Sequence, residues 1–187
     1  ILWRRDSMSK EYLFQSERLG FRNWIDSDTS KMIDISSDPH VMQFFPAIAT
    51  KIQTVDFIDK MKLMYIEKGY CYFAVDQLKD ESFIGFIGLC YQTYESQFTP
   101  GVDIGWRLNK KYWNNGLATE GAKKCLDYGF DKLGLKNIIA TTPIINIKSI
   151  RVMEKIGMQK LTEFKHPRLK SDKRLEDCVC YEIKNSN

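Results

Sequence analysis

The apolar and polar residues near the start of the chain follow first a strand pattern and then a helix pattern. Residues 12–24 are rich in β-prone side chains, and their apolar positions recur near a period of two, which predicts strand segments. Apolar residues at 32–35 follow possible N-caps at 26–28 and predict a short helix. This helix must end before Pro39, because proline cannot continue it.

A second helix and a β-hairpin are predicted next. We expect Thr54 to cap the helix and Gly69 to end it, since the apolar residues between them recur at helical spacing. Two β-rich runs follow at 71–76 and 83–91, joined by the polar residues 77–81. Two such runs with a short polar connection predict an antiparallel hairpin.

The next part of the chain alternates strands with a helix. Residues 102–109 have the pattern of a strand and lead into an amphipathic helix that Gly134 ends. Residues 137–142 then return as a β-branched and buried strand. The apolar face of the helix consists of Ala118, Ala122, Cys125, Leu126, Phe130 and Leu133.

Asn146 is the candidate N-cap of the last helix, which Gly157 ends. Strands at 158–164 and 177–184 close the chain. The predicted order is β-α-α-β-β-β-α-β-α-β-β, without repeats or linkers. This order predicts a single α/β domain over residues 1–187, with helices packed against one mixed sheet and residues 1–10 as a loosely packed N-terminal extension.

The composition narrows the class of protein. Hydrophobic residues make up 43% of the chain and charged residues 28%, which is a globular balance. The longest apolar stretch, 83–91, falls far short of the ~20 residues that cross a bilayer. Residues 1–10 lack the apolar region of a secretory signal. We therefore expect no membrane partner and a cytoplasmic location, with the chain acting as a monomer or homodimer.

The cysteines and histidines leave little room for metal or triad chemistry. The five cysteines have no CxxC spacing, so we expect reduced, buried thiols and no metal site. His40 and His166 are the two histidines, which are few for a metal site or a Ser-His-Asp triad. The chemistry is therefore sought in backbone geometry and carboxylates.

The formal charge of +4 is mild, and much of it lies in the basic stretch 165–174. A nucleic-acid binder usually shows a stronger basic stripe with interleaved aromatic residues, so nucleic acid is not an expected partner. The stretch is either a solvated loop between two strands or a surface that attracts phosphates or an acidic substrate. The sequence leaves both interpretations open.

Residues 102–120 are the most informative segment. A strand runs into a loop of small residues that opens directly into a helix. Free N–H groups at a helix start and the positive end of the helix dipole form an anion site. Gly116 and Ala118 allow the backbone to approach a phosphate closely, and Asn114 and Asn115 tolerate unusual dihedral angles. One glycine in a strand-to-helix turn is, by itself, weak support for an anion site.

Neighbouring motifs strengthen this interpretation. They are Asp103–Trp106, Tyr112–Glu120, and Asn146 with Ser149 and residues 154–158. With these motifs, and with Ser16–Arg22 as an opening strand, nearly the whole chain resembles the GNAT superfamily of acetyltransferases, specifically its ribosomal-protein N-terminal acetyltransferases and their relatives. In the loop, Trp113 stands where the superfamily has Gln or Arg, with Gly116 and Ala118 at the small positions.

The resemblance implies a mixed, mostly antiparallel sheet that splays in its middle, with helices on both faces, and acetyl-CoA as acyl donor. The amides of the loop would hold the pyrophosphate, and the splayed strand would hold the pantetheine arm, with Gly105 as a bulge at the parting. The implied cofactor-binding residues are Trp106, Arg107, Leu108, Trp113, Asn114, Asn115, Gly116, Leu117, Ala118, Thr119, Asn146, Ser149 and Met153.

Three residues are catalytic candidates. By the resemblance, the Trp106 amide faces the thioester oxygen. Asp103, where the branch often has Glu, would accept the amine proton through a water, or else it is a solvent-facing or structural carboxylate. Met153 replaces the Tyr that many relatives use as general acid, which leaves Ser149 as a substitute. Asn146 either caps its helix or also binds the cofactor.

The expected function is direct acetyl transfer to a primary amine of a small molecule or a protein N-terminus. Two rival functions stay open. A non-catalytic acyl-CoA-binding or regulatory module would share the phosphate loop, and a ribosome or RNA interaction domain would use the basic stretch. The same stretch argues against a polyamine acceptor, whose site should be rich in carboxylates.

Overall fold

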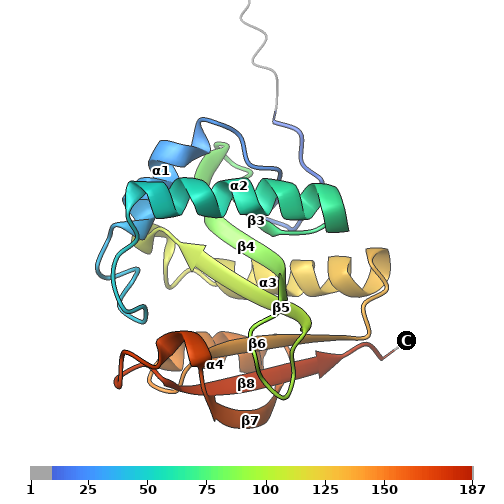
Figure 1. Cartoon of the computed structure of the whole chain (residues 1–187). Helices are drawn as coiled ribbons and strands as arrows, with labels where there is room; N and C mark the ends of the chain where they lie inside the picture. The colour runs from blue at the N-terminus through green and yellow to red at the C-terminus, as the bar shows by residue number, and fades with distance from the viewer. Residues whose placement is uncertain (1–9, 187) are drawn as a thin grey trace, which may run out of the picture.

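The computed structural model describes residues 10–186 and has one open sheet of eight strands in the order β1-β2-β3-β4-β5-β6-β8-β7 (Figure 1). Neighbouring strands are antiparallel except β5 and β6, which are parallel. The strands are β1 Phe14–Gln15, β2 Leu19–Arg22, β3 Tyr72–Gln77, β4 Ser82–Gln92, β5 Gly101–Leu108, β6 Asn137–Pro143, β7 Gln159–Lys165 and β8 Asp177–Lys184.

Helices cover both faces of this sheet. The view in Figure 1 has α2 in front of β3 and β4 and α3 behind the sheet. Helix α1 packs on α2, and α4 packs on α3 and β6. The α-helices are α1 Asp28–Ser36, α2 Lys51–Lys68, α3 Leu117–Asp127 and α4 Ile147–Lys155. Shorter turns follow at η1 Lys110–Tyr112, η2 Tyr128–Lys132 and η3 Pro167–Leu169. The predicted mixed, mostly antiparallel sheet between helices is confirmed.

The start of α2 differs from the prediction. Thr50, not Thr54, is the N-cap, because its hydroxyl accepts from the Gln53 amide and the Gln53 side chain accepts from the Thr50 amide. Thr54 is buried in the first turn, with its hydroxyl on the Thr50 carbonyl. The end of the helix at Gly69 is confirmed, since this residue has the left-handed conformation, φ 77°.

The sheet parts between β5 and β6. Asp103 opposite Ile139 is the one register pair that joins these strands in the described part of the chain. The pairing of β5 with β4 runs without a register shift from Gly101 to Leu108, so the predicted bulge at Gly105 is wrong. A Cβ at Gly105 would lie 3.1 Å from the ring of Tyr72, so this glycine makes room for that ring. The splay itself agrees with the prediction.

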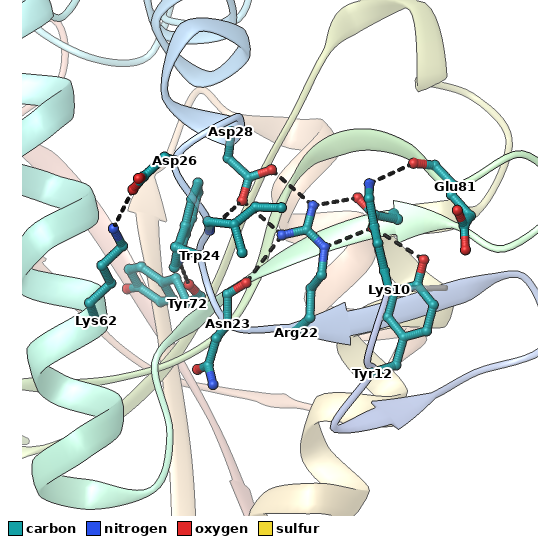
Figure 2. A network of polar contacts seen from close by, with 12 residues as sticks. Lys10, Tyr12, Arg22, Asn23, Trp24, Asp26, Asp28, Lys62, Tyr72 and Glu81 are labelled. Carbon is teal, nitrogen blue, oxygen red and sulfur yellow. Dashed lines mark hydrogen bonds and ion pairs between the residues drawn. The ribbon is translucent and has the colours of Figure 1, made fainter. Parts of the chain in front are cut away.

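A buried polar network holds the first strands to the hairpin (Figure 2). The Arg22 guanidinium donates to both carboxylate oxygens of Asp28 and of Asp76, at 2.7 to 2.9 Å. All three side chains are almost fully buried. Lys10 joins the edge of this network through Asp76, at 3.0 Å. Residues 1–9, the rest of the predicted extension, lie outside the described residues.

Breaking this network is expected to destabilise the fold strongly. Arg22→Met leaves buried Asp28 without a cation and leaves Asp76 with Lys10 alone, and removing one partner of a buried ion pair costs about 3–5 kcal/mol. Lys62→Met is the control, because Lys62 pairs with a fully exposed Asp26. Urea unfolding measures both variants. Equal unfolding midpoints for Arg22→Met and Lys62→Met would contradict the role given to the network.

Candidate functional site

A cavity of about 560 Å³ lies where β5 and β6 part. Its walls come from β5, the loop that follows it, the first turn of α3, the start of α4 and the segment after α1. The residues predicted from the sequence that line it are Asp103, Trp106, Arg107, Leu108, Trp113, Asn114, Gly116, Leu117, Ala118, Thr119, Asn146, Ser149 and Met153. The fold therefore brings together candidates from three separate segments.

The loop before α3 has the geometry of an anion site. Asn114 has φ 60° and Gly116 has φ 74°, both in the left-handed region that asparagine and glycine tolerate. Gly116 is the N-cap of α3 and no side chain caps this helix. The first amides of α3 therefore have no intrahelical partner, and they lie at the cavity wall with the positive end of the helix dipole.

The opening strands brace this loop. Glu120 of α3 accepts from the Ser16 hydroxyl at 2.6 Å and forms an ion pair with Arg18 at 2.6 Å. Arg18 also donates to the Asn115 carbonyl at 3.0 Å. Asn115 does not line the cavity, because its side chain turns back to the carbonyls of residues 112 and 113. Its role is thus to shape the loop.

The edge of β5 that faces β6 carries open backbone groups. The Asn109 amide donates to the Ile84 carbonyl at 2.9 Å, in register with the β4–β5 pairing. Because hydrogen-bonded and non-hydrogen-bonded pairs alternate in an antiparallel ladder, the Trp106 N–H points away from β4, into the parting of the sheet. The Leu108 carbonyl on the same edge accepts from the Trp113 indole at 3.0 Å. Trp113 thereby fixes the loop to the end of β5.

Asn146 is the N-cap of α4, and its polar side chain connects three groups. Its Oδ1 accepts from the Ser149 amide at 3.4 Å, and its Nδ2 donates to the hydroxyls of Thr142 and Ser149 at 3.0 and 3.1 Å. The Ser149 hydroxyl accepts from Asn146, so its own proton is free to point into the cavity. Met153 is buried one turn further along α4.

Asp103 is buried rather than solvent-facing, with 7% of its surface exposed. One carboxylate oxygen accepts from the Tyr72 hydroxyl at 2.6 Å, and the other accepts from the Gln92 amide at 3.0 Å. Burial raises the pKa of Asp103 to about 7, although the hydrogen bonds from Tyr72 and Gln92 and the charge of Arg168 oppose this shift. A carboxyl that titrates near neutral pH is suited to proton transfer.

Tyr72 and Gln92 are site residues that the sequence did not predict. Tyr72 lies on β3 and Gln92 at the end of β4, and the hairpin register brings both beside β5. No local sequence signal marks them, because their place depends on the register, in which Tyr72 pairs with Gly88 and Gly88 pairs with Gly105. A Cβ at Gly88 would meet the backbone of residues 71–73 and one at Gly105 would meet the Tyr72 ring, so the two glycines allow Tyr72 to lie close to β4 and β5.

Aromatic side chains wall one end of the cavity. They are Phe44, Phe45, Phe57, Tyr72 and Phe86. Trp24, Tyr70 and Tyr91 do not line the cavity. Figure 2 shows Trp24 beside Tyr72, whose carbonyl accepts from the indole at 2.8 Å. Trp24 thus supports the strand that carries Tyr72.

The basic stretch 165–174 folds toward this end of the cavity. Arg174 donates to the carbonyl of Gln43, a cavity-lining residue, at 2.8 Å. Glu176 accepts from Lys165 and Lys173 at 3.2 and 3.0 Å. Arg168 lies over the ring of Tyr94, 5.4 Å from its centroid. Asp172 forms an ion pair with Arg174 at 3.8 Å, so ion pairs neutralise much of the stretch, while the charge of Arg168 acts on Asp103 in the cavity.

Metal-binding clusters and membrane spans are both absent from the described residues 10–186. No group of three or more His, Cys, Asp and Glu side chains there could hold a metal ion. No helix in the same range is long and apolar enough to cross a membrane. All five cysteines are free and buried, as predicted.

Known proteins resemble the chain over most of its length. Residues 18–159 match the family described as "Acetyltransferase (GNAT) domain". The uncharacterized N-acetyltransferase YnaD of Bacillus subtilis is 35% identical over 151 residues, which cover 80% of this chain and 84% of YnaD.

Solved structures resemble the fold. A GNAT-family acetyltransferase from Bacillus anthracis has a TM-score of 0.75 at 31% identity, covering 91% of this chain and 96% of that one. The ribosomal-protein-S5-alanine acetyltransferase from Vibrio fischeri also has a TM-score of 0.75, at 19% identity, covering 93% of this chain and 97% of that one. At that identity the second likeness concerns the fold alone.

Proposed function

Since the chain belongs to the GNAT family of acetyltransferases, we propose that it moves the acetyl group of acetyl-CoA directly onto a primary amine held in the cavity at the parted strands. The acceptor is a small molecule or a protein N-terminus. The observation that carries the proposal is that one cavity contains an uncapped helix start, an open strand edge and a carboxyl that titrates near neutral pH. The narrower likeness to ribosomal-protein N-terminal acetyltransferases stays a prediction.

We assign the pyrophosphate of acetyl-CoA to the amides between Asn114 and Thr119. The left-handed Gly116 supports this assignment, because its φ of 74° opens α3 without a side-chain cap and leaves the first amides of the helix free at the cavity wall. Lys148, Arg151 and Lys155 of α4 line the same cavity and supply positive charge for the phosphates. The pantetheine arm would run along the open edge of β5, past Asn146 and Met153.

The Trp106 amide is proposed as the oxyanion donor. Its N–H points into the parting of the sheet, where the thioester oxygen gains negative charge as the amine attacks. A fixed backbone donor needs no reorganisation during the reaction, and such donors contribute ~3 kcal/mol each. The Trp113 indole supports this geometry by holding the Leu108 carbonyl at the end of β5.

Asp103 is proposed to receive the proton that the attacking amine loses. Because both of its oxygens already accept hydrogen bonds, one intervening water is the natural route. The C–N bond forms as the C–S bond breaks, and the departing thiolate takes a proton. Ser149 is the candidate donor, since its hydroxyl accepts from Asn146 and retains its own proton for the sulfur.

Binding of acetyl-CoA is expected to raise the melting temperature. A ligand at 100 times its Kd stabilises the folded state by about 2.7 kcal/mol, which is about 5–10 °C for a chain of this size. Differential scanning fluorimetry measures the shift, and pantetheine, which lacks the pyrophosphate, is the control. No shift and no calorimetric heat at millimolar acetyl-CoA would refute the cofactor assignment. Binding without thiol release on any amine would favour the non-catalytic acyl-CoA module.

A further inference from the structure

Arg107 is a half-buried arginine whose Nε is buried and whose guanidinium has no counter-ion among the described residues. It lies on β5 on the same face as Asp103, with Gly105 between them. Its Nη1 donates to the Ser36 hydroxyl at 3.2 Å, and its buried Nε has no hydrogen-bond partner in the described chain. No carboxylate of residues 10–186 forms an ion pair with it. Its other neighbours are the rings of Phe45 and Phe86, at 4.6 and 5.3 Å from the guanidinium carbon.

Arg22 is a buried arginine whose charge, unlike that of Arg107, is balanced by carboxylates. Two carboxylates surround Arg22 and satisfy its donors. Arg107 has no such pair, and burial lowers its pKa to about 10. The side chain therefore remains charged at neutral pH while its charge is uncompensated. An arginine fork of this kind is complete when a planar oxyanion occupies it.

The charges around the cavity fall into two groups. Lys148, Arg151 and Lys155 lie on α4, at the end assigned to the cofactor phosphates. Arg107 lies at the other end, among the aromatic side chains. Asp103 is the one carboxylate that lines the cavity within the described residues. The aromatic end thus contains a free cation that the cofactor phosphates do not reach.

We propose that Arg107 is the anion subsite of the acceptor pocket, and that the acceptor is a primary amine that also carries a carboxylate. This inference rests on the acetyl transfer proposed above. The amine faces Asp103 and the thioester, the carboxylate binds the guanidinium, and an apolar middle contacts Phe45 and Phe86. A polyamine would instead place a second cation against Arg107. Arg168, whose charge acts on Asp103, favours a negatively charged acceptor by long-range attraction.

Matched acceptors test the subsite. Phenylalanine and phenethylamine, tyrosine and tyramine, and 4-aminobutyrate and butylamine differ within each pair in the carboxylate. We expect kcat/KM for the carboxylate member to exceed that of its partner at least ~10-fold, as a charge-assisted hydrogen bond allows. Arg107→Gln should remove this preference by raising KM for the carboxylate member, and Arg107→Lys should restore part of it. Arg151→Gln, which removes a cation on α4, should leave the ratio unchanged.

The outcomes separate the subsite from the enzyme activity. Loss of acetyl-CoA binding or of thiol release on every amine concerns the proposed function, whereas equal loss for both members of each pair in Arg107→Gln overturns the subsite alone. If no amine of the panel is acetylated, the subsite is tested by titrating 3-phenylpropionate, which carries the carboxylate without the amine, into the CoA-bound protein. Saturable binding that Arg107→Gln abolishes supports the subsite, and absence of binding overturns it. Retained acetyl-CoA affinity shows that the variant is folded.

Discussion

Asp103→Asn is expected to lower turnover ~100- to 10,000-fold near neutral pH, the usual cost of losing a general base. Acetyl-CoA affinity should stay near that of the wild type, because backbone amides rather than Asp103 are assigned to the cofactor. The variant keeps the shape of the side chain and can still accept from the Tyr72 hydroxyl. The amide of Gln92 must turn to present its oxygen, which gives up the hydrogen bond that its Nε2 donates to the Tyr72 hydroxyl at 3.3 Å.

The pH profile gives the sharper measurement. The carboxylate is the active form, so wild-type kcat/KM should rise through pH 7, where Asp103 loses its proton. Asp103→Asn should lack this rise and keep the later one, above pH 8, that follows the increase of free amine. Stability offers an independent check. The pKa of Asp103 is raised in the folded state, so its contribution is present below pH ~4 and is lost as the pH rises through about 7.

Asp127→Asn is the matched control, because Asp127 is an exposed carboxylate at the far end of α3. Its rate and pH profile should equal those of the wild type. A near-normal rate and an unchanged rise through pH 7 in Asp103→Asn would mean that Asp103 is structural. The enzyme would then capture the neutral amine from solution.

Gly116→Val is expected to abolish measurable acetyl-CoA binding while the protein still folds. A valine side chain at this position would begin 3.6 Å from Arg18 Nη2, and we expect it to disturb the loop that brings the first amides of α3 to the cavity wall. The φ of 74° also strains a branched residue, by about 1–3 kcal/mol. Isothermal titration with acetyl-CoA measures the affinity, and circular dichroism measures the fold.

Gly134→Val is the control that separates backbone strain from an effect on the loop before α3. Gly134 has a similar φ of 64°, no atom lies within 4 Å of the place that a Cβ would occupy there, and the residue does not line the cavity. Both variants should therefore lose comparable stability, but Gly134→Val should bind acetyl-CoA normally. Unchanged affinity in a folded Gly116→Val protein would show that the pyrophosphate lies elsewhere.

Local signals predicted most of the fold. The helix end at Gly69 and the cap at Asn146 depend on residues next to each other, and both are confirmed. The helix predicted to end at Gly134 ends as α3 at Asp127 and continues as the π turn η2 to Lys132, two residues before the left-handed Gly134. The predicted start of α2 was wrong because two threonines, Thr50 and Thr54, are possible N-caps there. The capping box at Thr50, which includes Gln53, prevails over the hydroxyl of Thr54.

The residues of the candidate site likewise fall into those that the sequence predicts and those that it does not. The loop at 114–119 could be predicted because a glycine before a helix encodes its own backbone conformation. Tyr72 and Gln92 could not, because their contact with Asp103 depends on the register of three strands. The missing counter-ion of Arg107 is likewise a tertiary property, since a sequence does not reveal which carboxylates lie out of reach.

The burial of the cysteines matters because the reaction releases a thiol. Each acetyl transfer releases one molecule of coenzyme A with a free thiol, which can form mixed disulfides with accessible protein thiolates. Cys90 pairs with Asp103 across the β4–β5 ladder. Burial raises the pKa of Cys90 to about 12 and that of Cys180 also to about 12, so almost no thiolate exists at neutral pH. The fold thus keeps its own sulfur inert beside a reaction that produces thiol in every cycle.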